Sequence, residues 1–211
     1  MTSPARDEIM RRIRDALGPS PPAPAEVPRD YRQAGGPIDF DPVERFCEVV
    51  ADYDATVHRV GPSDLEDALA QACRERGASR LVVPSEAPWH VDGVDLVPDD
   101  PPLSPRDLDA LDGVLTGCAA AIAQTGSIVL DGAGHSGRRA ITLVPDLHLC
   151  VVLAGQIVAA VPDAIATMAP AAREGRPITF VSGPSATADI ELNRVQGVHG
   201  PRTLDVFVVS G

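Results

Sequence analysis

The chain has 211 residues, 44% of them hydrophobic, and a formal net charge of −12 at pH 7. This length suits one large α/β domain, or one such domain with an additional arm. The negative charge would repel nucleic-acid phosphates, and the arginines are scattered rather than gathered into a basic patch, so we expect no nucleic-acid partner.

Lysine and clustered metal ligands are both missing from the sequence. All 18 basic residues are arginine, which excludes a Schiff-base lysine, a P-loop lysine and a lysine general base. The four cysteines are far apart, no two histidines have metal-ligand spacing, and no dinucleotide-binding glycine motif follows a predicted strand. We therefore expect no metal and no cofactor in this chain.

The first residues are charged and lack the apolar segment of a signal peptide. The longest apolar stretch, residues 147–161, is interrupted by His148, Gly155 and Gln156 and is too short to span a bilayer. These features predict a cytoplasmic protein without a membrane span.

Residues 1–38 are predicted to form an N-terminal helical arm. A helix over residues 4–17 ends at Gly18, and a proline-rich, extended linker follows over residues 19–28. Such an arm either packs on its own domain or docks on a partner chain or a second copy of this chain. Docking is favoured, because the linker lets the helix reach away. The apolar face of the helix comprises Ile9, Met10, Ile13, Ala16 and Leu17.

Residues 39–211 are predicted to form the main domain, an α/β domain. Helices are expected after Asp41 and after Ser63, each at the start of a capping-box pattern, and also over residues 104–111, 118–123 and 162–172. Strands and helices alternate, and the strands are continuous apolar runs, which indicates a layered domain with a mostly parallel sheet. The predicted strands are residues 55–60, 80–84, 94–97, 114–115, 128–130, 149–153, 157–161, 178–181 and 204–209.

Three loop clusters hold the residues best suited to chemistry. The first loop cluster is residues 123–127, the second is 131–139, and the third combines 180–191 with 197–202. Ligands of open α/β sheets collect beyond the carboxyl ends of the strands. Because the second and third loop clusters both follow predicted strands, we expect them to share one rim of the sheet.

The third loop cluster has the composition of a small anion site. Gly183 permits a close backbone approach, and Ser185 or Thr187 can cap a helix whose first N–H groups would face the rim. Asp189 and Glu191 conflict with a simple phosphate site and suit instead carboxylates that hold a ligand hydroxyl or amine. The alternative, which the residues alone favour, is an ordinary helix start that carries its own acidic residues.

Several charged or titratable loop residues allow two interpretations each. His199 lies between two glycines, and a functional histidine and one that anchors a turn are equally favoured. Arg202 is either an anion partner or a solvated surface charge. In the second loop cluster, His135 with Arg138 and Arg139 could bind an acidic ligand, although a solvated loop is the favoured interpretation.

Three strings stand out in the second half of the chain: GCAAAIAQTGSIVL at residues 117–130, SGPSATADIE at 182–191 and GVHGPR at 197–202. They resemble the LUD domain of the lactate-utilisation protein C (LutC/YkgG) family. The second and third strings are specific only when they occur together. The resemblance covers roughly residues 39–210 in layout, and the N-terminal helix with its linker is similar to the usual start of that family.

The resemblance implies a three-layer α/β/α fold of the NagB/RpiA/CoA-transferase-like group, with a Rossmann-like sheet. It also implies a part in bacterial L-lactate oxidation to pyruvate, beside two partner proteins that hold the iron–sulfur clusters. The loop clusters supply eight ligand-binding candidates and three catalytic candidates, and the resemblance favours a site in the third loop cluster without supplying a catalytic residue. The ligand-binding candidates are Gln124, Thr125, Gly126, Ser127, Gly183, Ser185, Thr187 and Arg202; the catalytic candidates are Asp189, Glu191 and His199.

The sequence leaves the function open between an accessory subunit and an enzyme. The accessory subunit would dock to iron–sulfur lactate-utilisation proteins and would bind a small anionic ligand at the rim. The enzyme would stand alone, with Asp189 or Glu191 as base or nucleophile and with His199 and Arg202 gripping an anion. A third hypothesis is a scaffold without a site.

Overall fold

The computed structural model describes residues 4–18, 26–31, 36, 38–188, 194–197 and 199–211. The chain divides into two compact units, Met1–Tyr31 and Arg32–Gly211. The domain boundary between residues 38 and 39 stays a prediction. Within the described ranges, no helix combines the length and the apolar character needed to cross a bilayer.

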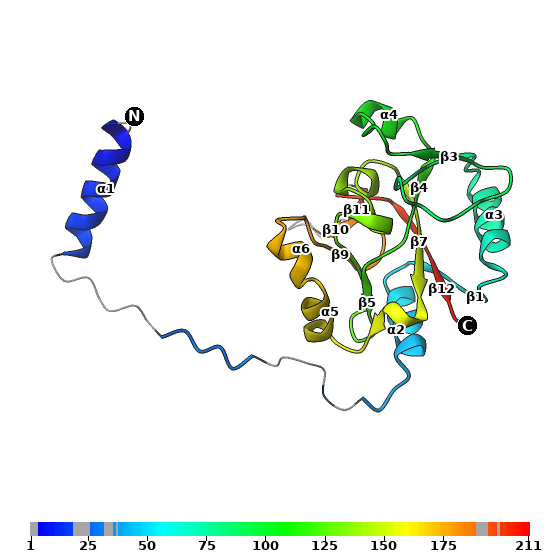
Figure 1. Cartoon of the computed structure of the whole chain (residues 1–211), viewed down its shortest axis with the longest axis horizontal. Helices are drawn as coiled ribbons and strands as arrows, with labels where there is room; N and C mark the ends of the chain where they lie inside the picture. Colours follow the sequence, from blue (N-terminus) through cyan, green and yellow to red (C-terminus); the bar gives the residue numbers. More distant parts are fainter. Residues whose placement is uncertain (1–3, 19–25, 32–35, 37, 189–193, 198) are drawn as a thin grey trace. The chain divides into compact units, whose positions relative to one another are not determined.

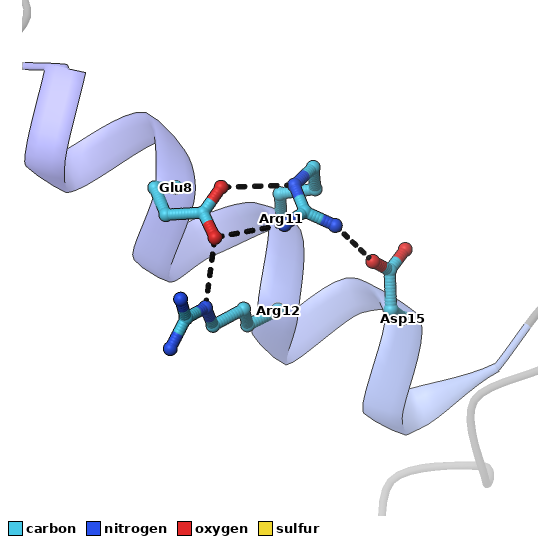
Figure 2. A network of polar contacts seen from close by, with 4 residues as sticks. All are labelled: Glu8, Arg11, Arg12 and Asp15. Carbon is cyan, nitrogen blue, oxygen red and sulfur yellow. Dashed lines mark hydrogen bonds and ion pairs between the residues drawn. The ribbon is translucent and has the colours of Figure 1, made fainter.

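The first unit contains helix α1 (Pro4–Leu17), which confirms the predicted helix. Its apolar side chains Ile9, Ile13 and Leu17 are about half exposed, and Gly18 ends it in the left-handed conformation that glycine adopts without strain. The polar side of α1 carries a row of ion pairs between residues three or four positions apart, drawn in Figure 2. This row comprises Glu8, Arg11, Arg12 and Asp15.

The second unit is built on a six-stranded sheet in the order β1-β12-β7-β4-β2-β3, and all neighbouring pairs are parallel. The strands β7 and β12 at its middle are fully buried over nearly their whole length, as expected for a parallel sheet covered on both faces. The mostly parallel α/β fold is therefore confirmed. The strands are β1 (Thr56–Val60), β2 (Arg80–Val83), β3 (Asp95–Pro98), β4 (Gly113–Thr116), β7 (Leu147–Leu153) and β12 (Thr203–Val209).

Three helices belong to the first half of this unit: α2 (Pro42–Asp52), α3 (Leu65–Arg76) and α4 (Pro105–Asp109). The Asp41 carboxylate caps α2 by accepting hydrogen bonds from the N–H groups of Val43 and Glu44. Ser104 forms a complete capping box at α4. The capping box predicted at Ser63 is wrong, because Asp64 is the N-cap of α3 and its side chain caps no N–H group there.

A second, four-stranded sheet in the order β8-β5-β6-β9 was not predicted. Its strands are β5 (Ala120–Ile122), β6 (Ser127–Leu130), β8 (Ile157–Val158) and β9 (Thr179–Val181). The helix predicted over residues 118–123 is wrong, since β5 pairs antiparallel with β6 and parallel with β8. This alanine-rich run favours a helix locally, but tertiary pairing and burial decide its conformation.

The layers of the second unit are defined by the side chains that pack together between them, and Figure 1 shows the same arrangement. Helix α3 packs its Leu69 and Cys73 against one face of the six-stranded sheet, next to Phe207. The opposite face packs against α2 and the second sheet, which contribute Phe46 and Ile128 to the core between the two sheets. Helix α5 covers the outer face of the second sheet. The central sheet is thus flanked by helices, with the small sheet inserted on one side.

Two predictions in the last third of the chain are corrected. The helix predicted over residues 162–172 is two helices, α5 (Val161–Thr167) and α6 (Ala169–Arg173), because Pro170 cannot continue the helical hydrogen bonding. The helix start predicted in the third loop cluster is a strand, β10 (Ala186–Ala188), paired antiparallel with β11 (Arg194–Gln196). Among the described residues of this loop cluster, 180–188, 197 and 199–202, no helix N-terminus is present to bind an anion.

Candidate functional site

A pocket of about 240 Å³ lies where the second and third loop clusters meet. Part of its lining lies at the amino ends of β7 and β12, where the sequence predicted no site. Residues 182–185 of the lining follow the carboxyl end of β9, as the sequence predicted for the third loop cluster. We call it the Arg139 pocket. The described residues that line it are Arg139, Thr142, His148, Thr179, Phe180, Val181, Ser182, Gly183, Pro184, Ser185, His199, Gly200 and Pro201.

The Arg139 guanidinium is the permanent positive charge of this pocket. Its Nη1 donates to the backbone oxygen of Thr142 at 2.8 Å and to the Thr142 hydroxyl at 3.0 Å, and its Nη2 donates to the backbone oxygen of His199 at 3.0 Å. Among the residues that the structure describes, no carboxylate forms an ion pair with it. Burial therefore lowers the pKa of Arg139 without a compensating carboxylate.

The backbone of His199 links two sides of the pocket. Its oxygen accepts from Arg139, and its N–H donates to the Ser185 hydroxyl oxygen at 3.1 Å. The backbone of Ser185 is fixed as well, because its N–H donates to Pro201 and its oxygen accepts from Gly197. Two loops of the third cluster are thereby fastened to each other and to Arg139, while the His199 side chain is exposed.

His148 lies at the buried end of the pocket, with about 1% of its surface exposed. Its Nε2 is 2.8 Å from the Thr116 hydroxyl. Burial, and to a lesser extent the positive charge of Arg139, lowers the pKa of His148 to about 4. The imidazole is therefore neutral at pH 7 and adds no charge to the pocket.

A row of three hydroxyls connects the first loop cluster to the pocket. The Thr125 and Ser127 hydroxyl oxygens are 2.8 Å apart, and those of Ser127 and Ser182 are 2.6 Å apart. Ser182 lines the pocket, so two of the predicted ligand-binding residues reach it through this third hydroxyl. The turn between β5 and β6 that carries Thr125 is thus coupled to the site by hydrogen bonds rather than by direct contact.

Other predicted site residues have different surroundings. Gly183 lines the pocket at φ +94°, and a β-carbon there would collide with the backbone oxygen of Tyr53. Gly126 approaches the backbone of α2 in a similar way, at φ +59°. The backbone N–H of Gln124 donates to the backbone oxygen of Ala159. Close packing against neighbouring backbone therefore sets the two glycine positions, and a backbone hydrogen bond sets that of Gln124.

The remaining candidates lie away from the described lining or outside the described residues. Arg202 is 3.2 Å from the Asp146 carboxylate in an exposed ion pair and does not line the Arg139 pocket. Thr187 is in β10, and nothing is described of its side chain. Asp189 and Glu191 lie outside the described residues, so their predicted roles stay predictions.

Of three residues central to the pocket, Thr142 and His148 were not proposed from the sequence. Arg139 was considered for an acidic ligand, but a solvated loop was the favoured interpretation. The string around Arg139 was noted, but an arginine that pairs with a carboxylate and one that lacks such a partner look the same in a sequence. His148 sits in an apolar strand, where a histidine without neighbouring polar residues gives no signal. Only the contact between β7 and the two later loops brings these residues together.

The cysteines are unsuited to nucleophilic or metal chemistry. All four are free thiols, and three of them are buried. Burial raises the pKa of Cys150 to about 12 and raises that of Cys118 as well, so both are protonated at pH 7. Over the described part of the chain, no group of three histidine, cysteine or acidic residues is arranged to hold a metal ion.

The family model and the similar sequences that comparison with known proteins finds agree with each other. Residues 105–209 match the model of the LUD domain family. The chain is 44% identical to lactate utilization protein C of Deinococcus radiodurans, over 99% of this chain and 97% of that protein. It is 26% identical to the protein of the same name from Geobacillus kaustophilus, over 97% of this chain and 96% of that one.

A solved structure supports the same relationship. The crystal structure of a DUF162 family protein from Deinococcus radiodurans superimposes with a TM-score of 0.70 at 42% sequence identity. The match covers 80% of this chain and 96% of the other. The sequence and structure comparisons therefore agree on one family.

Proposed function

Because the chain belongs to the lactate utilization protein C family and carries a LUD domain, we propose that it is an accessory subunit of a bacterial lactate-utilisation system. In this proposal it acts in the cytoplasm and docks to partner proteins that hold iron–sulfur clusters during oxidation of L-lactate to pyruvate. The observation that supports the proposal most strongly is the 44% identity over nearly the full length of both proteins.

The interior of the protein favours an accessory role over electron transfer by this chain. Three of the four thiols are enclosed in the core, and their raised pKa values keep them protonated. Iron–sulfur clusters need closely grouped cysteine thiolates as ligands, and the described part of the chain holds no group of three histidine, cysteine or acidic residues that could bind a metal. Partner chains would therefore supply the clusters in this system.

Deletion in the native host tests the role, and affinity purification tests the partners. We expect loss of growth on L-lactate as the carbon source and normal growth on pyruvate, with growth restored by the wild-type gene. The purified full-length chain should retain proteins whose iron content and electron paramagnetic resonance spectrum indicate iron–sulfur clusters. Unchanged growth on L-lactate, together with purification free of iron, would refute the proposal.

The exposed His199 side chain at the Arg139 pocket favours one alternative, a free-standing small-molecule enzyme. His199 would transfer a proton in that enzyme, with Asp189 or Glu191 as a second catalytic group. Turnover of a hydroxy acid, sugar phosphate, CoA thioester or folate by the purified chain, abolished by His199→Ala and by Asp189→Asn, would establish it. Absence of turnover with each of these substrate classes would refute it.

A further inference from the structure

We propose that the Arg139 pocket binds one small monocarboxylate, a 2-hydroxy or 2-oxo acid, with the carboxylate on Arg139. The anion class is argued from the pocket itself, whereas the choice of a 2-hydroxy or 2-oxo acid rests on the proposed function. The experiment below measures binding to the purified protein, so it can fail while growth on L-lactate still depends on this chain, and the reverse also holds.

Arg139 retains hydrogen-bonding capacity that the described residues do not use. A guanidinium has five N–H groups in a planar fork. The three described hydrogen bonds of Arg139 use at most three of them, and all three acceptors are uncharged oxygens of Thr142 and His199. The Nε–H and one Nη2–H have no acceptor among the described residues. These two N–H groups are left for a ligand, and a carboxylate is a suitable acceptor for guanidinium donors.

The charge of the pocket favours an anion. The chain has 30 acidic residues and a net charge of −12, yet none of the described residues that line the pocket is acidic. His148 is neutral, so Arg139 alone supplies a permanent charge. A partly buried arginine without a carboxylate partner is costly unless an anion joins it. One positive charge suits a monoanion better than a phosphate ester with two negative charges.

The size and lining of the pocket suit a small ligand. Its volume of about 240 Å³ lies below the range of roughly 300–1,000 Å³ that is common for drug-sized ligands. Val181, Pro184 and Pro201 provide an apolar wall for a short carbon chain. A ligand of three or four carbon atoms therefore fits better than a nucleotide or a coenzyme.

Two serine hydroxyls of the pocket can donate to the oxygen on the second carbon of the acid. The Ser185 oxygen accepts from the backbone of His199, and its O–H has no acceptor in the described part of the chain. If Thr125 donates to Ser127 and Ser127 to Ser182, the O–H of Ser182 is also free to donate. A 2-oxo or 2-hydroxyl oxygen provides the acceptor that these donors lack.

Isothermal titration calorimetry of the full-length protein tests the proposal. Pyruvate and L-lactate are titrated, together with lactamide, which has nearly the shape of lactate without its charge, and with inorganic phosphate. We expect one site per chain for at least one of the two acids, with lactamide and phosphate at least tenfold weaker. Arg139→Met should weaken binding of the acid by tenfold or more.

Arg173→Met is the matched control, because it removes an exposed arginine and changes the net charge equally. It should leave binding unchanged. Arg139→Gln is the second variant, since its amide can still donate to the backbone oxygens of Thr142 and His199, and it should fold normally and lose binding. No binding of either acid, unchanged binding in both Arg139 variants, equal loss in Arg173→Met, or tighter binding of phosphate would each overturn the proposal.

Discussion

Arg138 and Arg139 are adjacent in the chain but belong to two different regions. Arg138 turns toward the loop before α4, where its Nε and Nη2 donate to the Asp99 carboxylate and its Nη2 also donates to the Leu103 oxygen. Arg139 turns toward the pocket and donates only to uncharged oxygens. Hydrogen bonding to Asp99 raises the pKa of Arg138, whereas burial lowers the pKa of Arg139.

This difference separates a structural arginine from a binding arginine. The first has its carboxylate within the chain, so its charge is compensated before any ligand arrives. The second is partly buried without such a partner in the described part of the molecule, and it lines a pocket. Two residues of the same type thus differ in whether a carboxylate of the described chain already compensates their positive charge. Substitutions at each of them should therefore have different effects on stability.

Arg138→Met should produce the largest loss of stability. It leaves the Asp99 carboxylate, which is only 6% exposed, without its cation. Breaking a buried ion pair costs about 3–5 kcal/mol, and we expect about 3 kcal/mol here because a third of the Arg138 side chain is exposed. Urea unfolding at pH 7 measures it. The double variant with Asp99→Asn should recover part of the loss, and a loss below about 1 kcal/mol would contradict the structural role.

His148 should make stability depend on pH between about 4 and 6.5. Its pKa is about 4 in the folded state and near 6.5 when unfolded. The unfolded chain therefore binds the proton first as the pH falls. This part of the stability is complete above pH 6.5 and is lost as the pH falls toward 4, by on the order of 2–3 kcal/mol.

The variant His148→Gln isolates this effect, because glutamine can keep a hydrogen bond to Thr116 and does not titrate. Urea unfolding at pH 7 and pH 4.5 should show a smaller pH dependence in the variant than in the wild-type chain. Carboxylates with lowered pKa values, such as Asp112 and Asp131, titrate at lower pH and are common to both proteins. Equal pH dependence in the two proteins would contradict a buried, neutral His148.

Arg139→Met should change stability much less than Arg138→Met, although both remove one positive charge. The variant loses hydrogen bonds to Thr142 and His199 but also removes a partly buried charge that has no described carboxylate partner. These effects oppose each other, and we expect a net change within about 1 kcal/mol. Urea unfolding without added ligand measures it. A loss equal to that of Arg138→Met would remove the distinction between the two arginines.

Glu8→Gln in α1 should have the smallest effect. Its ion pairs with Arg11 and Arg12 are exposed, and exposed pairs contribute little. Hydrogen exchange of the α1 amides in the full-length chain should accelerate by no more than about twofold at low salt, and the difference should disappear at high salt. A large, salt-independent acceleration would show that Glu8 has a role other than pairing within the helix.

The sequence was informative where local chemistry decides the conformation. The largely apolar, buried strands β7 and β12 were predicted, and Asp41 and Ser104 cap helices as their patterns predicted. It was misleading where distant pairing decides. The alanine-rich run at residues 118–123 becomes a strand through its neighbours β6 and β8, and the serine-threonine string after Gly183 pairs with β11 instead of starting a helix.

The site shows the same limit. The sequence identified the loops of Ser185 and His199, because glycine and serine mark them, and the structure brings both to one pocket. It did not identify Arg139 as the charge of that pocket. With 18 arginines in the chain, the relevant property is the absence of a described carboxylate partner, and only the tertiary structure shows it.

The most direct test of the account follows the side-chain Nε–H resonances of Arg138 and Arg139 by NMR during titration with pyruvate, each assigned by its loss in the corresponding variant. We predict a saturable shift of the Arg139 resonance and no shift of the Arg138 resonance. Unchanged resonances for both arginines, or equal shifts of both, would contradict the assignment of Arg139 as the carboxylate-binding residue.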